Sequence, residues 1–286
     1  MRLGQRNNRS VLRTVGQAII ALVFLFPFYW AIVLSVAPKS KVFTLPPDLI
    51  PGWDFHPWEE VFKAAPWGLY FLHSVIITGS TILLVLITGA TAGYALSLST
   101  FRGREVVFGI FLAALMVPPE AILIPDYVVA YHLHVLNSLT GQVLPFAANV
   151  FAIFIFRQFF KTLPKEMWDA AQLDGASWWR YLWNLALPLS KPAVATVSLL
   201  TFSSQWSQFQ WPLIITQGQA ARPIEVALSY FQGFDGTHWR ELAAASILTL
   251  TPIIIVFLFT QRYFVVSVAG RIDDRESSVA IGPRNQ

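Results

Sequence analysis

The sequence predicts an all-α membrane protein whose helices cross the bilayer six times. Of its 286 residues, 55% are hydrophobic and only 13% are charged, whereas an ordinary soluble domain carries roughly 25% charged residues. The mean hydropathy is +0.54, and 23 Phe and 11 Trp are spread along the chain. These figures exclude disorder. Because there is no Cys, disulfides, thiolate metal sites and cysteine nucleophiles are excluded as well.

Six apolar stretches are long enough to span a membrane. A helix that crosses about 30 Å of hydrocarbon needs roughly 20 apolar residues, with no unpaired charge near its centre. The predicted spans are residues 15–37, 71–99, 106–124, 139–156, 193–216 and 242–260.

The basic residues that flank these spans predict their orientation. Fifteen of the 20 Lys and Arg lie on the side that holds both termini. The opposite side has only Lys39, Lys41, Lys63, Arg222 and Arg240. Because basic residues gather on the cytoplasmic side of membrane proteins, we expect both termini to be cytoplasmic. Topology then accounts for the net charge of +4, and no nucleic-acid partner is expected.

The spans hold little that could support catalysis or proton coupling. Their ionisable residues are Glu120 and His73, each near an outer end. His132 and His134 are two residues apart and have no acidic cluster beside them, so no metal site is predicted. No GxxxxGK[ST] motif is present to bind a nucleotide, and no catalytic GxSxG or HExxH motif occurs. We therefore expect neither an enzyme nor a bound cofactor, and any energy for transport must come from another polypeptide.

The fifth span carries the candidate solute path. Neutral polar groups and aromatic rings alternate through its middle, and Thr201, Gln205 and Gln208, at positions i, i+4 and i+7, fall on one helical face. Amides and hydroxyls suit the hydroxyl groups of a sugar, and aromatic faces suit its C–H faces. Alternatively, the same groups could hold neighbouring helices together. The predicted path residues are Thr201, Ser204, Gln205, Gln208 and Trp211.

Small residues and prolines predict two local features of the other spans. Gly89 and Gly93 form a GxxxG pattern in the second span, which lets helices approach closely. We interpret it as a packing face, either within the chain or against a second membrane subunit. Pro118 and Pro119 are expected to interrupt the third span.

The inner segment 164–188, between spans four and five, predicts two short helices. Pro164 suits a first helical position, Gly175 a C-terminal cap and Ser177 the start of a second helix, which Pro188 would end. On physical grounds alone, the pair could equally lie in the headgroup region, anchored by its four Trp.

The spacing in this segment resembles a known signature. Asp169-Ala170-Ala171-x3-Gly175-x9-Leu185-x-Leu187-Pro188 is similar to the E-A-A-x3-G-x9-I-x-L-P signature of permease subunits in binding-protein-dependent ABC importers. Asp replaces Glu and Leu replaces Ile at the two positions that depart from it. Gly93-Tyr94-Ala95-Leu96, Met116-Val117-Pro118 and Trp206-x-Gln208-x-x-Trp211-Pro212-Leu213 resemble the carbohydrate branch, which includes maltose and glycerol-3-phosphate permeases.

The resemblance implies an ATP-driven importer of a sugar, oligosaccharide or glycerol-phosphate-type solute. It implies four kinds of partner: a second permease subunit, two ATPase subunits that bind ATP and Mg, an extracytoplasmic solute-binding protein, and membrane lipid. The residues that it assigns to ATPase coupling are Asp169, Ala170, Ala171, Asp174 and Gly175. The location would be a bacterial or archaeal cytoplasmic membrane.

The resemblance also implies one transmembrane permease domain over residues 1–286. Residues 1–69 would form the N-terminal span and outer loop, 70–265 the core permease region and 271–286 a cytoplasmic tail.

Two alternatives remain from the sequence. The chain could be a partner-free channel or secondary carrier for neutral solutes, in which case the purified chain would transport without ATP. It could also be a membrane scaffold that recruits a soluble protein, in which case changes at Gln205 and Gln208 would alter assembly but not selectivity.

Overall fold

The computed structural model describes residues 3–233 and 236–280, and over these ranges the chain is almost entirely helical. Its strands in these ranges, β1 (Gln232–Gly233) and β2 (Gly236–Thr237), form one short antiparallel pair in which Gln232 faces Thr237. The chain divides into two compact units. The first unit comprises Met1–Trp67 and Ala227–Pro252, and the second comprises Gly68–Val226 and Ile253–Gln286.

The first unit contains α1 (Leu3–Ser35), η1 (Lys39–Lys41), α2 (His56–Ala64), most of η4 (Ile224–Phe231), the strand pair and the beginning of α13 (Trp239–Ala280). Its core joins α2, η4 and α13 through the buried residues Val61, Phe231, Ala244 and Ala245. These are apolar side chains from distant parts of the sequence, so their burial holds the outer loop to the start of α13.

An ion pair also fixes the outer loop. The Arg240 guanidinium donates to Asp54 at 2.9 Å and to the carbonyl of Ala37 at 3.0 Å. The backbone N–H of His56 donates to the Asp54 carboxylate, and this bond together with Arg240 lowers the pKa of Asp54 below its usual value. The carboxylate therefore stays charged and bonded over the whole neutral range.

The second unit contains the remaining helices and both parts of the molecule with candidate functions. In order they are α3 (Trp67–Ser97), α4 (Arg104–Ala114), α5 (Pro119–His132), α6 (Leu139–Val143), η2 (Leu144–Phe146), α7 (Val150–Phe160), α8 (Lys165–Leu173), α9 (Trp178–Tyr181), the π-helical η3 (Leu182–Ala186), α10 (Leu187–Leu189), α11 (Lys191–Trp206), α12 (Gln210–Ile215) and the rest of α13.

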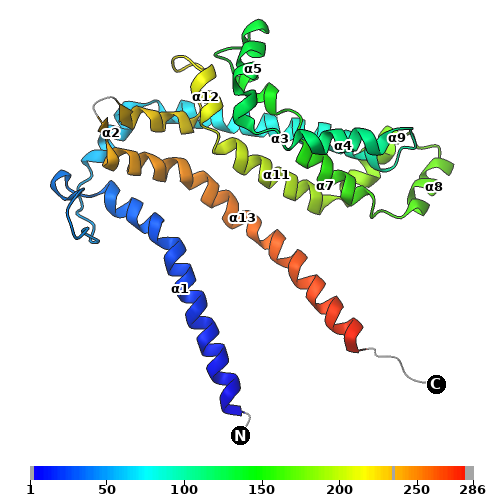
Figure 1. The fold of residues 1–286 in the computed structure, drawn as a ribbon, viewed down its shortest axis with the longest axis horizontal. Helices are drawn as coiled ribbons and strands as arrows, with labels where there is room; N and C mark the ends of the chain where they lie inside the picture. The colour runs from blue at the N-terminus through cyan, green and yellow to red at the C-terminus, as the bar shows by residue number, and fades with distance from the viewer. Residues whose placement is uncertain (1–2, 234–235, 281–286) are drawn as a thin grey trace. The chain divides into compact units, whose positions relative to one another are not determined.

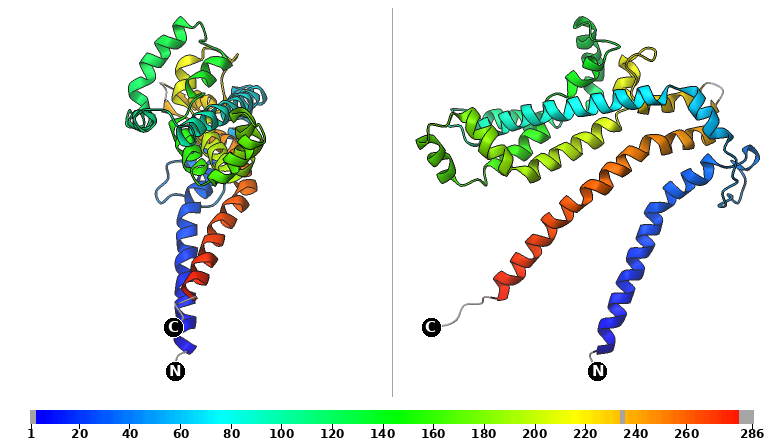
Figure 2. Two further views of the ribbon diagram at one scale, coloured as in Figure 1. Left: turned by 90° about the vertical axis from the view of Figure 1, so that its right-hand side faces the viewer. Right: turned by 180° about the vertical axis from the view of Figure 1, so that it is seen from behind.

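Helices α3, α7 and α11 form the centre of this unit (Figures 1 and 2). The Phe71 ring at the start of α3 meets Trp206 at the end of α11, so these two helices run side by side in opposite directions. Helix α7 packs on α11 and α4, and α12 packs on α5 and α6. The buried cluster that joins α3, α7 and α11 extends to Ala171 and Tyr181 in the inner segment.

Three helices are long and apolar enough to cross a membrane without a break: Arg13–Ser35 within α1, the whole of α3, and Trp239–Thr260 within α13. They match the first, second and sixth predicted spans. The other three predicted spans overlap helix pairs with bends of 98° (α4 and α5), 47° (Leu139–Phe146 and α7) and 81° (Trp178–Leu189 and α11). In the last pair the bend lies before residue 193, where the predicted span begins. The described residues thus provide three uninterrupted spans, or six if each bent pair counts as one.

The break within 106–124 was predicted, whereas the expectation of continuous helices over 139–156 and 193–216 is wrong, because η2 ends at Phe146 and α11 ends at Trp206. Local chemistry explains the breaks. Pro118 is extended, with φ −66° and ψ 136°, because it precedes another proline, which confirms the predicted interruption there. Asn149 caps α7 by accepting a hydrogen bond from the backbone N–H of Ala152 at 3.1 Å. Such a cap starts a new helix within an apolar stretch.

The predicted GxxxG face lies against α7 of the same chain. A Cβ atom on Gly93 would come within 2.7 Å of the Phe156 Cβ and 3.0 Å of the Arg157 backbone nitrogen. A Cβ on Gly89 would come within 3.1 Å of the Ala152 Cβ. The close contact between the backbones of α3 and α7 therefore requires glycine at position 93 more strictly than at position 89.

A buried cation ties α7 to both α3 and α4. Arg157 is only 3% exposed, and its Nε–H donates to the carbonyl of Leu96 at 2.9 Å. Its Nη2 lies 2.7 Å from both carboxylate oxygens of Glu105, and its guanidinium carbon lies 3.8 Å from the centre of the Phe108 ring. Arg157 is one of the fifteen Lys and Arg that predict the cytoplasmic side, and its burial depends on partners far away in the sequence.

We expect the effect of replacing Glu105 on protein stability to depend on whether Arg157 is present. The Glu105 side chain is 64% exposed, so it can return to water when Arg157 is replaced, whereas Arg157 would remain buried when Glu105 is replaced. Glu105→Gln should therefore lower the thermal midpoint in the wild-type background and lower it much less in Arg157→Met. Thermal unfolding of the purified protein measures this difference.

The exposed pair of Glu59 and Lys63, 3.9 Å apart, supplies the control. Glu59→Gln should change stability by no more than about 0.5 kcal/mol. Equal costs of Glu105→Gln with and without Arg157 would contradict the assignment of a buried ion pair.

Candidate solute pathway and coupling segment

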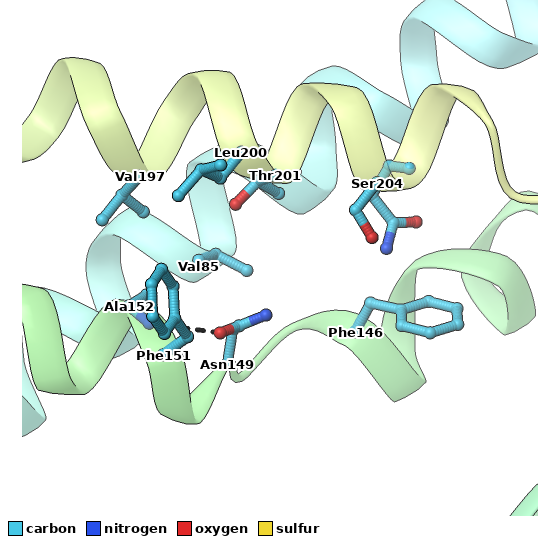
Figure 3. A pocket seen from close by; sticks show the side chains of 10 residues that line it. Val85, Phe146, Asn149, Phe151, Ala152, Val197, Leu200, Thr201 and Ser204 are labelled. Carbon is cyan, nitrogen blue, oxygen red and sulfur yellow. Dashed lines mark hydrogen bonds between the residues drawn. The ribbon is translucent and has the colours of Figure 1, made fainter. Parts of the chain in front are cut away.

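A cavity of about 220 Å³ lies in the second unit between α11 on one side and η2 and α7 on the other (Figure 3). Helix α11 contributes side chains at successive turns, and the facing side is made by the break between η2 and α7. The lining residues are Val85, Phe146, Asn149, Phe151, Ala152, Val197, Leu200, Thr201, Ser204 and Gln205.

The polar part of this cavity is uncharged. Thr201 and Ser204 project from α11 toward the side that carries Asn149 (Figure 3), and Gln205 lines the same cavity. The Asn149 side-chain oxygen is used to cap α7. Hydroxyl and amide groups can both donate and accept hydrogen bonds, and Phe146 and Phe151 supply aromatic surface. Such a mixture can bind a solute that has hydroxyl groups and apolar C–H faces.

A second, much smaller cavity of about 10 Å³ adjoins the first. Phe146 and Gln205 line both cavities, which therefore meet at these two residues. Its other lining residues come from α3, α6, α12 and the segments beside them: Ser74, Ile77, Thr78, Gln142, Gln208, Trp211, Pro212 and Pro223.

The five predicted path residues line one or both cavities. Thr201, Ser204 and Gln205 line the larger one, and Gln205, Gln208 and Trp211 line the smaller one. The Trp211 ring is 3% exposed, and its Nε1–H donates to the Gly141 carbonyl at 3.1 Å. Trp211 therefore also attaches α12 to α6.

The predicted common helical face of Thr201, Gln205 and Gln208 is wrong for Gln208. Helix α11 ends at Trp206, and α12 begins at Gln210. Pro212 explains the break, because in a continuous helix its ring would collide with the carbonyl of Gln208 and leave that carbonyl without a donor. In the first turn of α12 the proline causes no such loss.

Sequence reasoning missed most of the other cavity residues, among them Thr78, Gln142, Phe146 and Asn149. Gln142 and Asn149 were detectable as amides inside an otherwise apolar stretch. Thr78 and Phe146 carried no such signal, because hydroxyls and aromatic rings are common in spanning helices.

The inner segment folds as two helices joined at Gly175, as the motif indicated. Helix α8 ends with a pair of backbone bonds, from Gly175 N–H to Gln172 at 3.0 Å and from Ala176 N–H to Ala171 at 2.9 Å. Gly175 has φ +73°, so this is the left-handed glycine cap of a Schellman motif. Ser177 caps the following helix by accepting from Arg180 N–H at 3.3 Å.

That helix was predicted to end at Pro188, and it ends one residue later. The helical segment runs through the π turn Leu182–Ala186 and ends at Leu189. The π turn precedes Pro188, and Pro188 lies in the first turn of α10, where its missing N–H and its ring are tolerated.

Aromatic rings hold the inner segment to α3. Tyr94 of α3 lies 6.3 Å from Trp168 and 6.2 Å from Trp178 between ring centres, and Trp168 packs edge-on against Tyr181 at 4.8 Å. This packing ties α8 to the central helices, so a displacement of α8 must move α3 or break the aromatic cluster.

The predicted coupling residues do not all face outward. Asp169, Ala170, Asp174 and Gly175 are exposed, whereas Ala171 is 7% exposed and belongs to the buried core cluster. The two alanines are adjacent, and one helical step of 100° turns their side chains to different sides. Leu173, which the motif does not include, is 90% exposed.

Comparison with known proteins identifies the family. Residues 86–269 match the model of the family described as binding-protein-dependent transport system inner membrane component. The chain belongs to this family.

Characterised family members align over nearly the whole chain. The sn-glycerol-3-phosphate transport system permease protein UgpE of Yersinia pestis bv. Antiqua (strain Antiqua) is 35% identical over 255 residues, which cover 85% of this chain and 90% of the relative. The arabinooligosaccharides transport system permease protein AraQ of Bacillus subtilis (strain 168) is 30% identical over 251 residues, covering 86% and 89%.

A solved structure shares the fold. A chain of a bacterial ABC transporter involved in the import of the acidic polysaccharide alginate superposes with a TM-score of 0.76 at 24% identity, covering 91% of this chain and 98% of that one. The prediction of a multi-pass membrane permease is thus confirmed. The matched family region includes every lining residue of the larger cavity except Val85, the Gly89 and Gly93 packing face and the whole inner segment.

Proposed function

We propose that this chain is the permease subunit of an ATP-driven importer in which segment 164–188 couples a separate ATPase to the central helices. The observation that supports this proposal is that α8 has one exposed side and one side buried in the core. Its outer surface exposes Asp169, Ala170 and Leu173, while Ala171 is buried in the core that contains α3, α7 and α11.

Such a helix can transmit force because it is short, capped at its end and packed against a core. An ATPase that bound the exposed face could shift α8 as a rigid body, and the Tyr94 cluster would pass the shift to α3. Asp169 would offer the ATPase a charged hydrogen-bond acceptor. Binding of ATP by the partner would then favour one of two helix packings, so that one side of the path opens as the other closes.

The full assembly is proposed to contain a second permease subunit, two ATPase subunits that bind ATP and Mg, and an extracytoplasmic binding protein. A related alginate transporter structure was obtained in complex with a pentasaccharide-bound periplasmic protein, which supports the binding-protein partner. Six spans, with each bent pair counted as one, and cytoplasmic termini agree with the distribution of Lys and Arg. The location is then a bacterial or archaeal cytoplasmic membrane.

The transported solute is proposed to be a sugar, an oligosaccharide or a glycerol-phosphate-type compound. The relatives named for sn-glycerol-3-phosphate and arabinooligosaccharides support this class. The uncharged hydrogen-bonding groups of the larger cavity, Asn149, Thr201, Ser204 and Gln205, support a contact with hydroxyl groups of the solute.

Cysteine cross-linking tests the coupling, since the chain has no Cys of its own. In the assembled importer, a bifunctional thiol reagent should link Ala170→Cys, but not Ala171→Cys, to a cysteine on the ATPase, because Ala170 is exposed and Ala171 is buried. Uptake into liposomes should require ATP. Uptake by the purified chain without ATP or partners would instead support a carrier, and equal linking at both positions would contradict the assigned surface.

A further inference from the structure

The small cavity contains two buried oxygen atoms that lack hydrogen bonds. Thr78 and Gln142 are 3% and 1% exposed, both line this cavity, and neither Thr78 Oγ1 nor Gln142 Oε1 has a partner within the described residues. Buried polar groups are nearly always paired, and each unpaired one costs about 1–3 kcal/mol. Two such atoms at one cavity indicate a site that is complete only when something else is bound.

The orientation of the Gln142 amide follows from its other hydrogen bond. Its side-chain nitrogen donates to the backbone carbonyl of Ala221. The Ala221 carbonyl can only accept a hydrogen bond. If the oxygen and nitrogen of the Gln142 amide were exchanged, two acceptor oxygens would face each other. The free atom of Gln142 is therefore the acceptor Oε1.

Thr78 supplies the complementary group. One turn earlier on α3, Ser74 also lines the cavity, but its hydroxyl already accepts from the backbone N–H of Ile224 at 2.8 Å. The Thr78 hydroxyl remains able both to donate and to accept. One bound hydroxyl group could therefore donate to Gln142 and accept from Thr78.

The small cavity lies beside the candidate path and shares two lining residues with it. Phe146 and Gln205 line both cavities, so a shift of either side chain would join the two. At about 10 Å³ the small cavity has room for about one water molecule. A larger solute group could enter it only after that shift.

We propose that Thr78 and Gln142 form a subsite that binds an uncharged hydroxyl group of the transported solute once Phe146 and Gln205 move apart. This subsite rests on the function proposed above. It favours hydroxyl over phosphate or carboxylate groups, because a fully ionised anion cannot donate to Gln142 Oε1 and no charged residue lines the cavity among the described residues.

Helix α3 offers a matched control. Thr81 is fully buried, and its Oγ1 also lacks a partner in the described parts of the chain, yet Thr81 lines neither cavity. Replacing threonine by valine keeps the shape and removes the hydroxyl. Both Thr78→Val and Thr81→Val should therefore leave thermal stability unchanged or slightly raised, and only Thr78→Val should affect transport.

The experiment measures uptake of radiolabelled arabinotriose, a neutral oligosaccharide, and of sn-glycerol-3-phosphate by the complete importer in liposomes with its binding protein. Thr78→Val should raise the half-saturating concentration for uptake or lower the rate by about five- to tenfold, the effect of one lost hydrogen bond. Thr78→Ser should restore transport because it keeps the hydroxyl, and Thr81→Val should match the wild type.

Unchanged uptake in Thr78→Val would overturn the subsite and assign the cavity to a structural water. An equal loss in Thr81→Val, or a lower thermal midpoint in Thr78→Val, would also overturn it by pointing to a packing defect. Failure of the wild-type importer to take up either compound would instead contradict the proposed solute class, and the subsite with it.

Discussion

Gly93→Ala is expected to prevent α3 and α7 from packing and to remove most of the folded protein from the membrane. The added Cβ would lie 2.7 Å from the Phe156 Cβ and 3.0 Å from the Arg157 backbone nitrogen. Neither atom is the end of a flexible side chain, so the two helices must separate. We expect a loss of about 3 kcal/mol or more, at the upper end of overpacking effects, measured as folded yield and thermal midpoint in detergent.

Two other glycines on α3 give a graded control. Gly89→Ala meets the Ala152 Cβ at 3.1 Å and should be intermediate, whereas Gly79→Ala meets nothing within 4 Å. Gly79→Ala should even gain up to about 1 kcal/mol, because alanine is the better helix former. If all three variants behaved alike, the close approach of α3 and α7 would be refuted.

Gly175→Val is expected to uncouple ATP hydrolysis from solute uptake while the chain still inserts and assembles. A Cβ atom at this position would meet nothing within 4 Å, but Gly175 has φ +73°. A left-handed conformation costs an L residue about 1–2 kcal/mol, and more for a β-branched one. The cap of α8 should therefore open, so that displacement of α8 is absorbed locally instead of reaching α3.

The ratio of solute taken up to ATP hydrolysed, measured in the reconstituted importer, tests this expectation. Gly175→Asn should retain most of the wild-type ratio, since asparagine tolerates this conformation. Gly218→Val carries the same backbone strain, at φ +72° with no atom within 4 Å, but lies outside the coupling segment and should leave the ratio unchanged. Normal uptake by Gly175→Val, with the ATPase attached, would exclude a rigid coupling helix.

The course of the chain was predictable wherever one residue dictates local geometry. Pro118 and Pro119 indicated a break because proline forces the residue before it out of the helical region. Gly175 and Ser177 indicated caps because their conformations and hydrogen bonds depend only on near neighbours. The breaks at Asn149 and before Pro212 were equally local in origin, but the overall hydropathy that predicted these spans does not register them.

The candidate path was predictable in composition but not in arrangement. Polar residues at bilayer depth drew attention to Thr201, Ser204 and Gln205, and all three line the larger cavity. The facing wall, which Phe146 and Asn149 provide, comes from a segment some 50 residues earlier in the chain. No periodicity within one helix can indicate which distant segment will lie opposite.

The amino-acid sequence by itself determined the membrane class, the basic-residue asymmetry and the capped helices of the coupling segment, because hydropathy, charge and backbone preference act over a few residues. Tertiary structure alone decided that Ala171 faces inward while Ala170 faces outward, that Arg157 is buried against Glu105, and that Thr78 and Gln142 meet at one cavity. Each of these depends on contacts between segments far apart in the chain, and such contacts form only when the helices pack.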